Sequence, residues 1–98
     1  MANWRYHPQF PMDLRKAILH FDAISSNLGK RFREEVRVKL GLIAHNPELY
    51  ACINGAIRAA RLRRFPFVVL YTIEEDCVYF VSLVPGSSDR GSWFDRLG

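Results

Sequence analysis

The sequence has little that would point to an oxidised, metal-dependent or membrane-spanning protein. Only two cysteines, Cys52 and Cys77, occur among the 98 residues, without the CxxC spacing of redox and zinc motifs. Polar and charged residues begin at Asn3 and Arg5, so no signal peptide is expected. The apolar run at 65–71 is far shorter than the roughly 20 residues needed to cross a bilayer. These absences predict a cytosolic protein with reduced thiols and no membrane partner.

The sequence also lacks the motifs of common catalytic centres. It contains no glycine-rich phosphate loop, no HExxH motif and no recognisable Ser/His/Asp set. Glu34 and Glu35 are adjacent, so on a helix they point in different directions and do not form an acid/base pair. The histidines are scattered, at His7, His20 and His45. No cofactor and no metal site are therefore expected.

Negative charge is absent from one long stretch. No acidic residue falls between Tyr50 and Ile73, whereas the same stretch holds four arginines: Arg58, Arg61, Arg63 and Arg64. The whole chain has a formal net charge of +4. Such an excess favours nucleic acid or an acidic protein as a partner.

The composition is that of an ordinary globular protein, with 49% hydrophobic and 24% charged residues. A chain of this length is expected to form one domain, residues 1–98. A domain this small buries a limited share of its surface, so a partner chain that covers apolar surface would stabilise it.

Hydrophobic spacing predicts two helices after a short strand. Residues 3–8 alternate like an edge strand that a proline ends. Apolar residues recur with helical spacing over residues 11–25, and again from Ser26 or Asn27, either of which can cap the second helix. The Asn-Pro pair at 46–47 stops that helix. Because the connection is so short, an antiparallel helical hairpin is expected.

The second half of the chain is expected to form strands. Its segments are a loop at 47–56, strands at 57–64 and 65–73, an acidic turn at 74–76, a return strand at 77–84 and a short helical tail near 92–97. The nearly all-apolar second strand is typical of a central strand covered on both faces. The predicted fold class is α+β, in the order β-α-α-β-β-β, with the two helices packed on one face of a small, curved antiparallel sheet.

The four arginines would lie on both faces of the 57–64 strand. Alternation places Arg61 and Arg63 on one face, and Arg58 and Arg64 on the other. Three uses remain open from the residues alone: to bind phosphates, to dock acidic or C-terminal groups of a protein, or to protect an edge strand from aggregation. Arginine stays protonated, so it serves poorly as a general base but can stabilise a phosphoryl transition state.

Three stretches suggest a family: YHPQFPMDLRKAILHF, LGKRFREEVRVKLGLIAHNPELY and RLRRFPFVVLYTIEEDCVYFVSLV. Together, and in this order over almost the whole chain, they resemble the RelE/ParE superfamily of toxins from bacterial type II toxin–antitoxin systems, and more closely its ParE, or plasmid-stabilisation, branch. The resemblance implies a two-helix hairpin on an antiparallel sheet and an antitoxin partner that wraps the toxin. RelE-like members cleave messenger RNA in the ribosome, and ParE-like members inhibit DNA gyrase.

The resemblance carries over only in part to individual residues. Arg61 and Arg63 fall where RelE-like toxins place basic residues. Val68 falls where those enzymes have an arginine, Ser88 where both branches usually have an arginine, and Phe94 where RelE-like enzymes often use a tyrosine. Several groups that would position RNA and stabilise charge are thus absent, which predicts no efficient RNA cleavage.

The segment after the last strand departs further. Pro85 replaces a histidine common in ParE-like sequences, and only Asp89 and Trp93 remain of that segment. Arg90 could replace the missing arginine by a shift of two positions. The candidates for any catalytic role are Arg61, Arg63 and Arg90, and the predicted target-binding set is Arg58, Arg61, Arg63, Arg64, Arg90 and Trp93.

Three functions follow as hypotheses. The first is a ParE-like toxin, or a relative of one, that an antitoxin neutralises and that acts on DNA gyrase. The second is a ribosome-dependent endoribonuclease, and the third is a non-toxic module that binds an antitoxin. A homodimer or a hetero-oligomer with the antitoxin is compatible with each.

Overall fold

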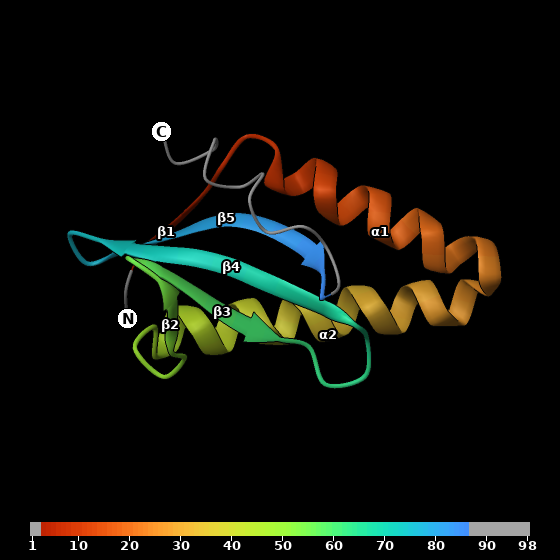
Figure 1. Ribbon diagram of the computed structural model, residues 1–98. Helices are drawn as coiled ribbons and strands as arrows, with labels where there is room; N and C mark the ends of the chain where they lie inside the picture. The colour runs from red at the N-terminus through yellow and green to blue at the C-terminus, as the bar shows by residue number, and fades with distance from the viewer. Residues whose placement is uncertain (1–2, 87–98) are drawn as a thin grey trace.

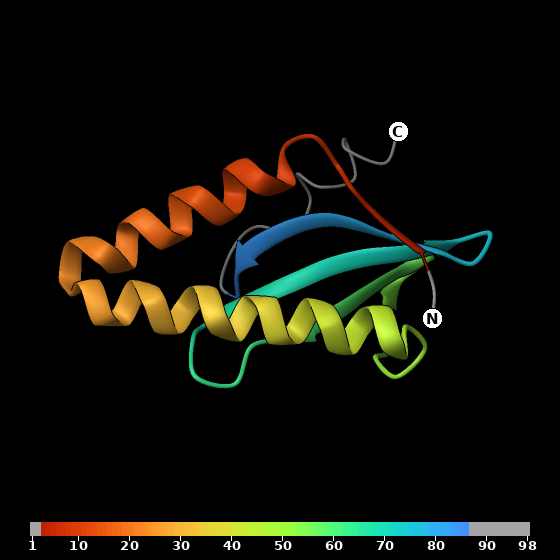
Figure 2. The same cartoon turned by 180° about the vertical axis from the view of Figure 1, so that it is seen from behind.

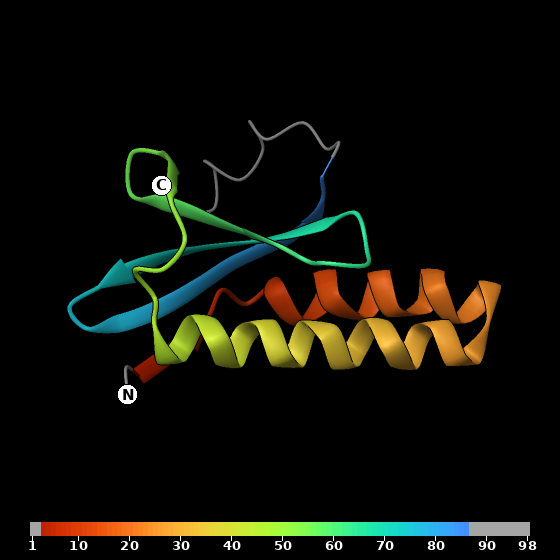
Figure 3. The ribbon, with the colours of Figure 1, turned by 90° about the horizontal axis from the view of Figure 1, so that it is seen from below.

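A computed structural model gives the arrangement of residues 3–86, which are the residues described below. Its elements are β1 (Asn3–Tyr6), α1 (Phe10–Ile24), α2 (Ser26–His45), β2 (Cys52–Asn54), β3 (Ile57–Arg61), β4 (Phe67–Glu74) and β5 (Cys77–Pro85). The two helices run antiparallel along one face of a five-stranded sheet (Figures 1 and 3). The predicted α+β fold with a helical hairpin on one face of the sheet is confirmed. The predicted helical tail near 92–97 lies outside the described residues.

The sheet has the strand order β1-β5-β4-β3-β2, with β4 at its centre. The pairs β2–β3, β3–β4 and β4–β5 are antiparallel, but β1 pairs with β5 in parallel, so the sheet is mixed rather than antiparallel throughout. Side chains alternate along a strand whichever way its neighbour runs, so the sequence pattern held no sign of this pairing. The N-terminal strand thus ends up beside the last strand of the described chain.

The segment 47–56, expected to be a loop, contains the short edge strand β2. All three residues of β2 are exposed, and its pairing with β3 is irregular between Cys52 and Asn54. Gly55 has a φ of 54°, a left-handed conformation that glycine adopts without strain, and it turns the chain into β3. A strand this short and exposed has no hydrophobic alternation by which it could be predicted.

Ser25 separates the two helices. Its backbone is extended, and its side-chain oxygen accepts a hydrogen bond from the Leu28 backbone N–H at 3.4 Å, so Ser25 caps α2 in place of the expected Ser26 or Asn27. Close by, Gly29 lies against Asp22 of α1, where an added Cβ would overlap the carboxylate. The hairpin is therefore tight at its closed end (Figure 2).

Asp13, in the first turn of α1, fastens that helix to the sheet. Its carboxylate accepts hydrogen bonds from the Ser82 hydroxyl at 3.1 Å and from the Leu83 backbone N–H at 3.2 Å. At this point the register of β4 and β5 shifts, because Leu70 pairs with Ser82 but the next residue pairs with Phe80. The acid thus binds β5 beside a bulge, where ladder pairing is interrupted.

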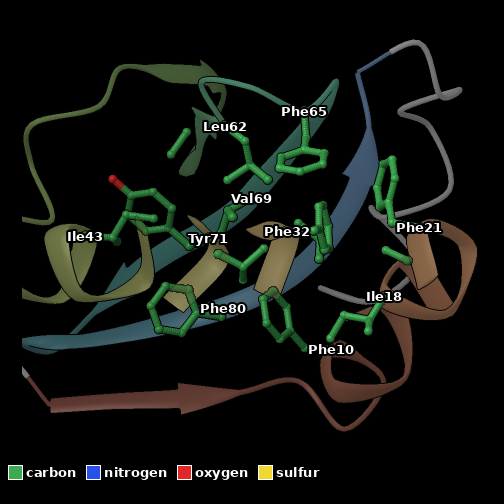
Figure 4. Packing of buried hydrophobic residues seen from close by; sticks show 14 of the residues in the cluster. Phe10, Ile18, Phe21, Phe32, Ile43, Leu62, Phe65, Val69, Tyr71 and Phe80 are labelled. Carbon is green, nitrogen blue, oxygen red and sulfur yellow. The ribbon is translucent and has the colours of Figure 1, made fainter. Parts of the chain in front are cut away.

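The main core lies between the helices and the sheet and is rich in phenylalanine (Figure 4). Phe21 and Phe32, from the two helices, pack within 5.0 Å of the Phe65 ring, measured between ring centroids. A smaller apolar cluster of Ile57, Val68 and Leu70 belongs to the other face of the sheet. The prediction that the central strand is buried on both faces is therefore confirmed.

Within residues 3–86, neither helix combines the length and the apolar character needed to cross a membrane.

Candidate target-binding surface

The predicted strand 57–64 ends at Arg61, and residues 62–66 form a connection to β4. A hydrogen bond from the Leu62 N–H to the Phe67 carbonyl, at 3.0 Å, closes this connection. Leu62 and Phe65 are buried and point into the core (Figure 4). The hydrophobic effect on these two side chains turns the residues between them outward. Arg63 and Arg64 therefore lie exposed in a loop, and the expected sharing of strand faces with Arg61 and Arg58 is wrong for both.

Arg61 is exposed at the end of β3, opposite Val68 of β4. Its guanidinium lies beside the end of β5, since a Cβ at Gly86 would be 3.5 Å from Nη1. The Gly86 N–H donates to the Pro66 carbonyl at 2.8 Å, which holds the end of β5 against the 62–66 connection. Arg61 and the arginines of that connection thus lie at the same end of the sheet, Arg61 beside Val68 and the other two beside α2.

Glu35 of α2 holds the 62–66 connection through its backbone. Its carboxylate accepts the backbone N–H of Arg63 at 2.5 Å and that of Arg64 at 3.1 Å. These charge-assisted bonds use the main chain of the two arginines and not their guanidinium groups. Within residues 3–86, no carboxylate forms an ion pair with Arg61, Arg63 or Arg64.

The sequence alone did not single out Glu35, because its position on the polar face of α2 is also typical of a solvated charge. Its neighbour Glu34 does have that simple role. Glu34 pairs with Arg37 one turn along the helix, and this hydrogen bond lowers the pKa of the Glu34 carboxyl. The only sequence signal for Glu35 was two acids side by side on a helix otherwise rich in arginine and lysine.

A hollow of about 510 Å³ lies between α2 and the arginine connection. Arg31, Arg63 and Arg64 line it, and Leu28, Val38 and Phe65 supply apolar surface. Its two carboxylates, those of Glu34 and Glu35, already accept the hydrogen bonds described above. The hollow therefore offers guanidinium donors to phosphate or carboxylate groups of a partner.

Arg58 has a different environment from the other three arginines. It is half-buried in β3, and its Nη1 donates to the carbonyl oxygens of Tyr50, at 2.6 Å, and of Glu48, at 3.4 Å. Tyr71, its cross-strand neighbour, donates its hydroxyl to the Pro47 carbonyl at 2.6 Å. Burial raises the pKa of Tyr71 to about 12, against the opposing effect of the Arg58 charge. These bonds give Arg58 a structural task in holding the loop after α2.

The remaining residues that the sequence singled out are not part of the arginine surface that the structure describes. Arg90 and Trp93 lie outside the described residues, as do Ser88 and Phe94. Val68 is buried in the apolar cluster on the sheet face turned away from the helices, next to Arg61. Within residues 3–86, no group of three or more histidine, cysteine, aspartate or glutamate side chains is placed to hold a metal ion.

The structure is similar to a chain of the chromosomal ParDE TA system from P. aeruginosa, with a TM-score of 0.77 and 11% identity over 87% of this chain and 96% of that one. It is also similar to the isolated E. coli RelE toxin, with a TM-score of 0.67 and 15% identity over 99% of this chain and 96% of that one. The chain has the RelE/ParE toxin fold. No protein-family model and no curated protein sequence matches it. The RelE/ParE fold is common to both of these structures, so it does not by itself choose between a ParE-like and a RelE-like activity.

Proposed function

We propose that the chain is a ParE-like toxin, or a relative of one, from a bacterial type II toxin–antitoxin system, and that a cognate antitoxin neutralises it. The arginine surface formed by Arg61, Arg63 and Arg64 carries this proposal. On the RelE/ParE fold, Arg63 and Arg64 are exposed on a connection that Glu35 holds in place, and Arg61 is exposed at the adjoining end of β3. No carboxylate of residues 3–86 forms an ion pair with any of the three. Such a surface is ready to bind a macromolecule through phosphate or carboxylate groups.

DNA gyrase is the proposed target. Cleavage of messenger RNA would need groups that transfer protons as well as groups that stabilise charge, and arginines supply only the latter. The buried, apolar Val68 next to Arg61 adds no such group. Inhibition by binding requires no proton transfer, so it fits the described residues better.

Loss of positive charge at the arginine surface should abolish growth inhibition. We expect induced wild-type protein to arrest bacterial growth, and the double variant Arg61→Gln/Arg63→Gln to permit growth at equal protein levels. The matched control is Arg15→Gln/Arg33→Gln, which removes two exposed arginines beside a hollow between the helices and should still arrest growth. In a supercoiling assay with purified gyrase, the first variant should be at least about tenfold less potent.

Other outcomes would change the proposal in defined ways. Cleavage of translated messages, mapped by primer extension and lost in Arg61→Ala, would replace gyrase inhibition by endoribonuclease activity. Absence of any growth effect, together with a tight complex with the product of a neighbouring gene, would indicate a non-toxic antitoxin-binding module. Equal growth arrest by both double variants would exclude the arginine surface as the functional site.

A further inference from the structure

One stripe of α2 faces the 62–66 connection across the hollow of about 510 Å³, which we call the α2/62–66 hollow (Figure 2). The stripe consists of residues spaced three or four apart, which lie on one side of a helix: Leu28, Arg31, Glu35 and Val38. The connection supplies Arg63, Arg64 and Phe65 on the other wall. Cationic and apolar side chains are therefore neighbours on both walls of the hollow.

Arg31 has no ion pair within residues 3–86, and the position of Glu35 explains why. An arginine and a glutamate four residues apart on an exposed helix face commonly pair with each other. Glu35 instead accepts the backbone N–H groups of Arg63 and Arg64. The carboxylate that holds the connection thus leaves a third guanidinium group at the hollow that can bind a ligand.

The two carboxylates at the hollow do not cancel its positive charge. Glu34 accepts hydrogen bonds from Nε and Nη2 of Arg37, and Glu35 accepts those from the main chain of the connection. The lining holds three guanidinium groups and two carboxylates, and Arg37 compensates one of the carboxylates. The hollow therefore has an excess of positive charge, which favours an anionic ligand.

Apolar surface lies beside these cations. Val38 is 46% exposed, and Leu28 is half-buried. Phe65 is buried, because its ring packs on Phe21 and Phe32 in the core (Figure 4). A ligand that covered the exposed aliphatic surface would gain hydrophobic stabilisation in addition to its ionic bonds. The hollow thus suits a ligand that has an apolar group close to its negative charge.

A C-terminal apolar residue of a protein has this combination. Its carboxylate and its side chain are attached to the same carbon atom, so one can bind guanidinium groups while the other covers aliphatic surface. An aspartate or glutamate side chain brings charge without apolar surface.

Nucleic acid matches the lining less well. Single strands bind through bases that stack on exposed aromatic rings, and the ring of Phe65, the aromatic side chain of this lining, is buried. The phosphates of a duplex would bind the arginines but would leave the aliphatic surface of Leu28 and Val38 in water.

We propose that the α2/62–66 hollow binds the C-terminal residue of a partner protein in which that residue is apolar. Its carboxylate binds Arg31, Arg63 and Arg64, and its side chain covers Leu28 and Val38. This inference rests on the proposed function, because Arg63 and Arg64 also belong to the arginine surface, and it names the chemistry by which that surface recognises a protein. Peptide binding is measured on the purified chain, so it can fail while growth arrest persists, and the reverse also holds.

The probe is a short peptide of serine and alanine that ends in leucine with a free carboxylate. It is titrated into the isotope-labelled full chain and followed by the NMR shifts of the backbone amides of residues 63–65. We expect binding at this site. Amidation of the peptide's C-terminus should weaken it by at least about tenfold, and serine in place of the final leucine by at least about threefold.

Variants of the chain test the two halves of the hollow separately. Arg31→Gln should weaken binding by at least about fivefold. Its matched control is Arg33→Gln, which removes an exposed arginine of α2 at the hollow between the helices and should leave affinity within about twofold. Val38→Ser should weaken binding by at least about threefold, whereas Leu42→Ser, at a similarly exposed position of α2 outside the hollow, should not change it. Circular dichroism of each variant checks that the helices are retained.

Several results would overturn the proposal. These are the absence of shifts with the wild-type chain, equal binding of the acid and amide peptides, or equal binding by Arg31→Gln and Arg33→Gln. Full affinity in Val38→Ser would overturn it too, because the apolar side chain of the ligand would then have no role. A short DNA duplex that binds more tightly than the peptide, with binding lost in Arg31→Gln, would assign the hollow to nucleic-acid phosphates instead.

Discussion

The loop that follows α2 and the connection that follows β3 are fastened in opposite ways. In the 46–51 loop, the Arg58 guanidinium donates to backbone carbonyl oxygens. In the 62–66 connection, the Glu35 carboxylate accepts backbone N–H groups. A cation holds one loop and an anion holds the other. In the first loop the Arg58 guanidinium is occupied by bonds within the chain. In the second, the guanidinium groups of Arg63 and Arg64 take no part in the fastening and can bind a partner.

This difference shows that the count of arginines overstates the binding surface. The four residues lie within seven positions of one another and are chemically identical. Their tasks are set by whether the chain at each position is in the strand, where Arg58 faces the loop after α2, or beyond it, where Leu62 and Phe65 hold the arginines outward. Function is therefore better assigned by the groups that hold each arginine than by the local charge density.

The largest effect should come from removing the cation that holds the 46–51 loop. Arg58→Ala leaves the carbonyl oxygens of Tyr50 and Glu48 without this donor, and should lower the free energy of unfolding by about 2 kcal/mol, the usual range for hydrogen bonds to charged groups. Arg63→Ala, which removes an exposed guanidinium with no partner in residues 3–86, should change it by less than about 0.5 kcal/mol. Urea unfolding of both variants measures the difference. Equal losses would contradict the opposite assignments.

Removal of the anion at the other loop should have a slightly smaller effect. Glu35→Ala takes away the acceptor of two N–H groups that water can partly replace, and we expect a loss of about 1.5 kcal/mol in urea unfolding. Glu34→Ala is its neighbour control and should leave the free energy of unfolding almost unchanged, because it breaks only an exposed pair on one helix. If the two variants are equally stable, Glu35 does not fasten the connection.

The smallest effect concerns Tyr71, and it depends on pH. Tyr71→Phe removes the hydrogen bond to the Pro47 carbonyl and should cost about 1 kcal/mol near neutral pH. The folded pKa of Tyr71, about 12, lies above the ordinary value near 10, so the proton stabilises the fold fully below pH 10 and this contribution is lost as the pH rises toward 12. The gap between wild type and variant should therefore narrow in alkaline urea titrations. A gap that stays constant or widens would argue against the raised pKa.

The sequence predicted those parts of the fold that rest on periodic burial. Both helices and the central strand β4 were found within a few residues of their observed bounds, because side chains such as Phe32 and Val69 recur at the spacing that each structure buries. The direction of β1 and the existence of β2 could not be found in this way. Both are exposed edge strands, and pairing at an edge depends on where the chain returns in space.

The sequence predicted which positively charged residues belong to the candidate site, but it did not predict how they are arranged. Four arginines without an intervening acid indicated a basic surface, and Arg61 remains on it. Alternation misplaced Arg63 and Arg64, since the strand ends three residues earlier than expected, at Arg61. Glu35 lies 28 residues from Arg63 in the chain, so no local pattern could connect them.

Because β1 pairs in parallel with β5, the first described strand can pair only after the last one has been synthesised. Residues 3–6 pair with residues 77–80, so during synthesis β1 can join the sheet only after β5 has been made. Phe80, on which the Tyr6 ring stacks, and Gly86, whose N–H donates to the Pro66 carbonyl, are synthesised at the same late stage. A chain synthesised only as far as β4 thus lacks both the strand that pairs with β1 and the Gly86 N–H that holds the 62–66 connection.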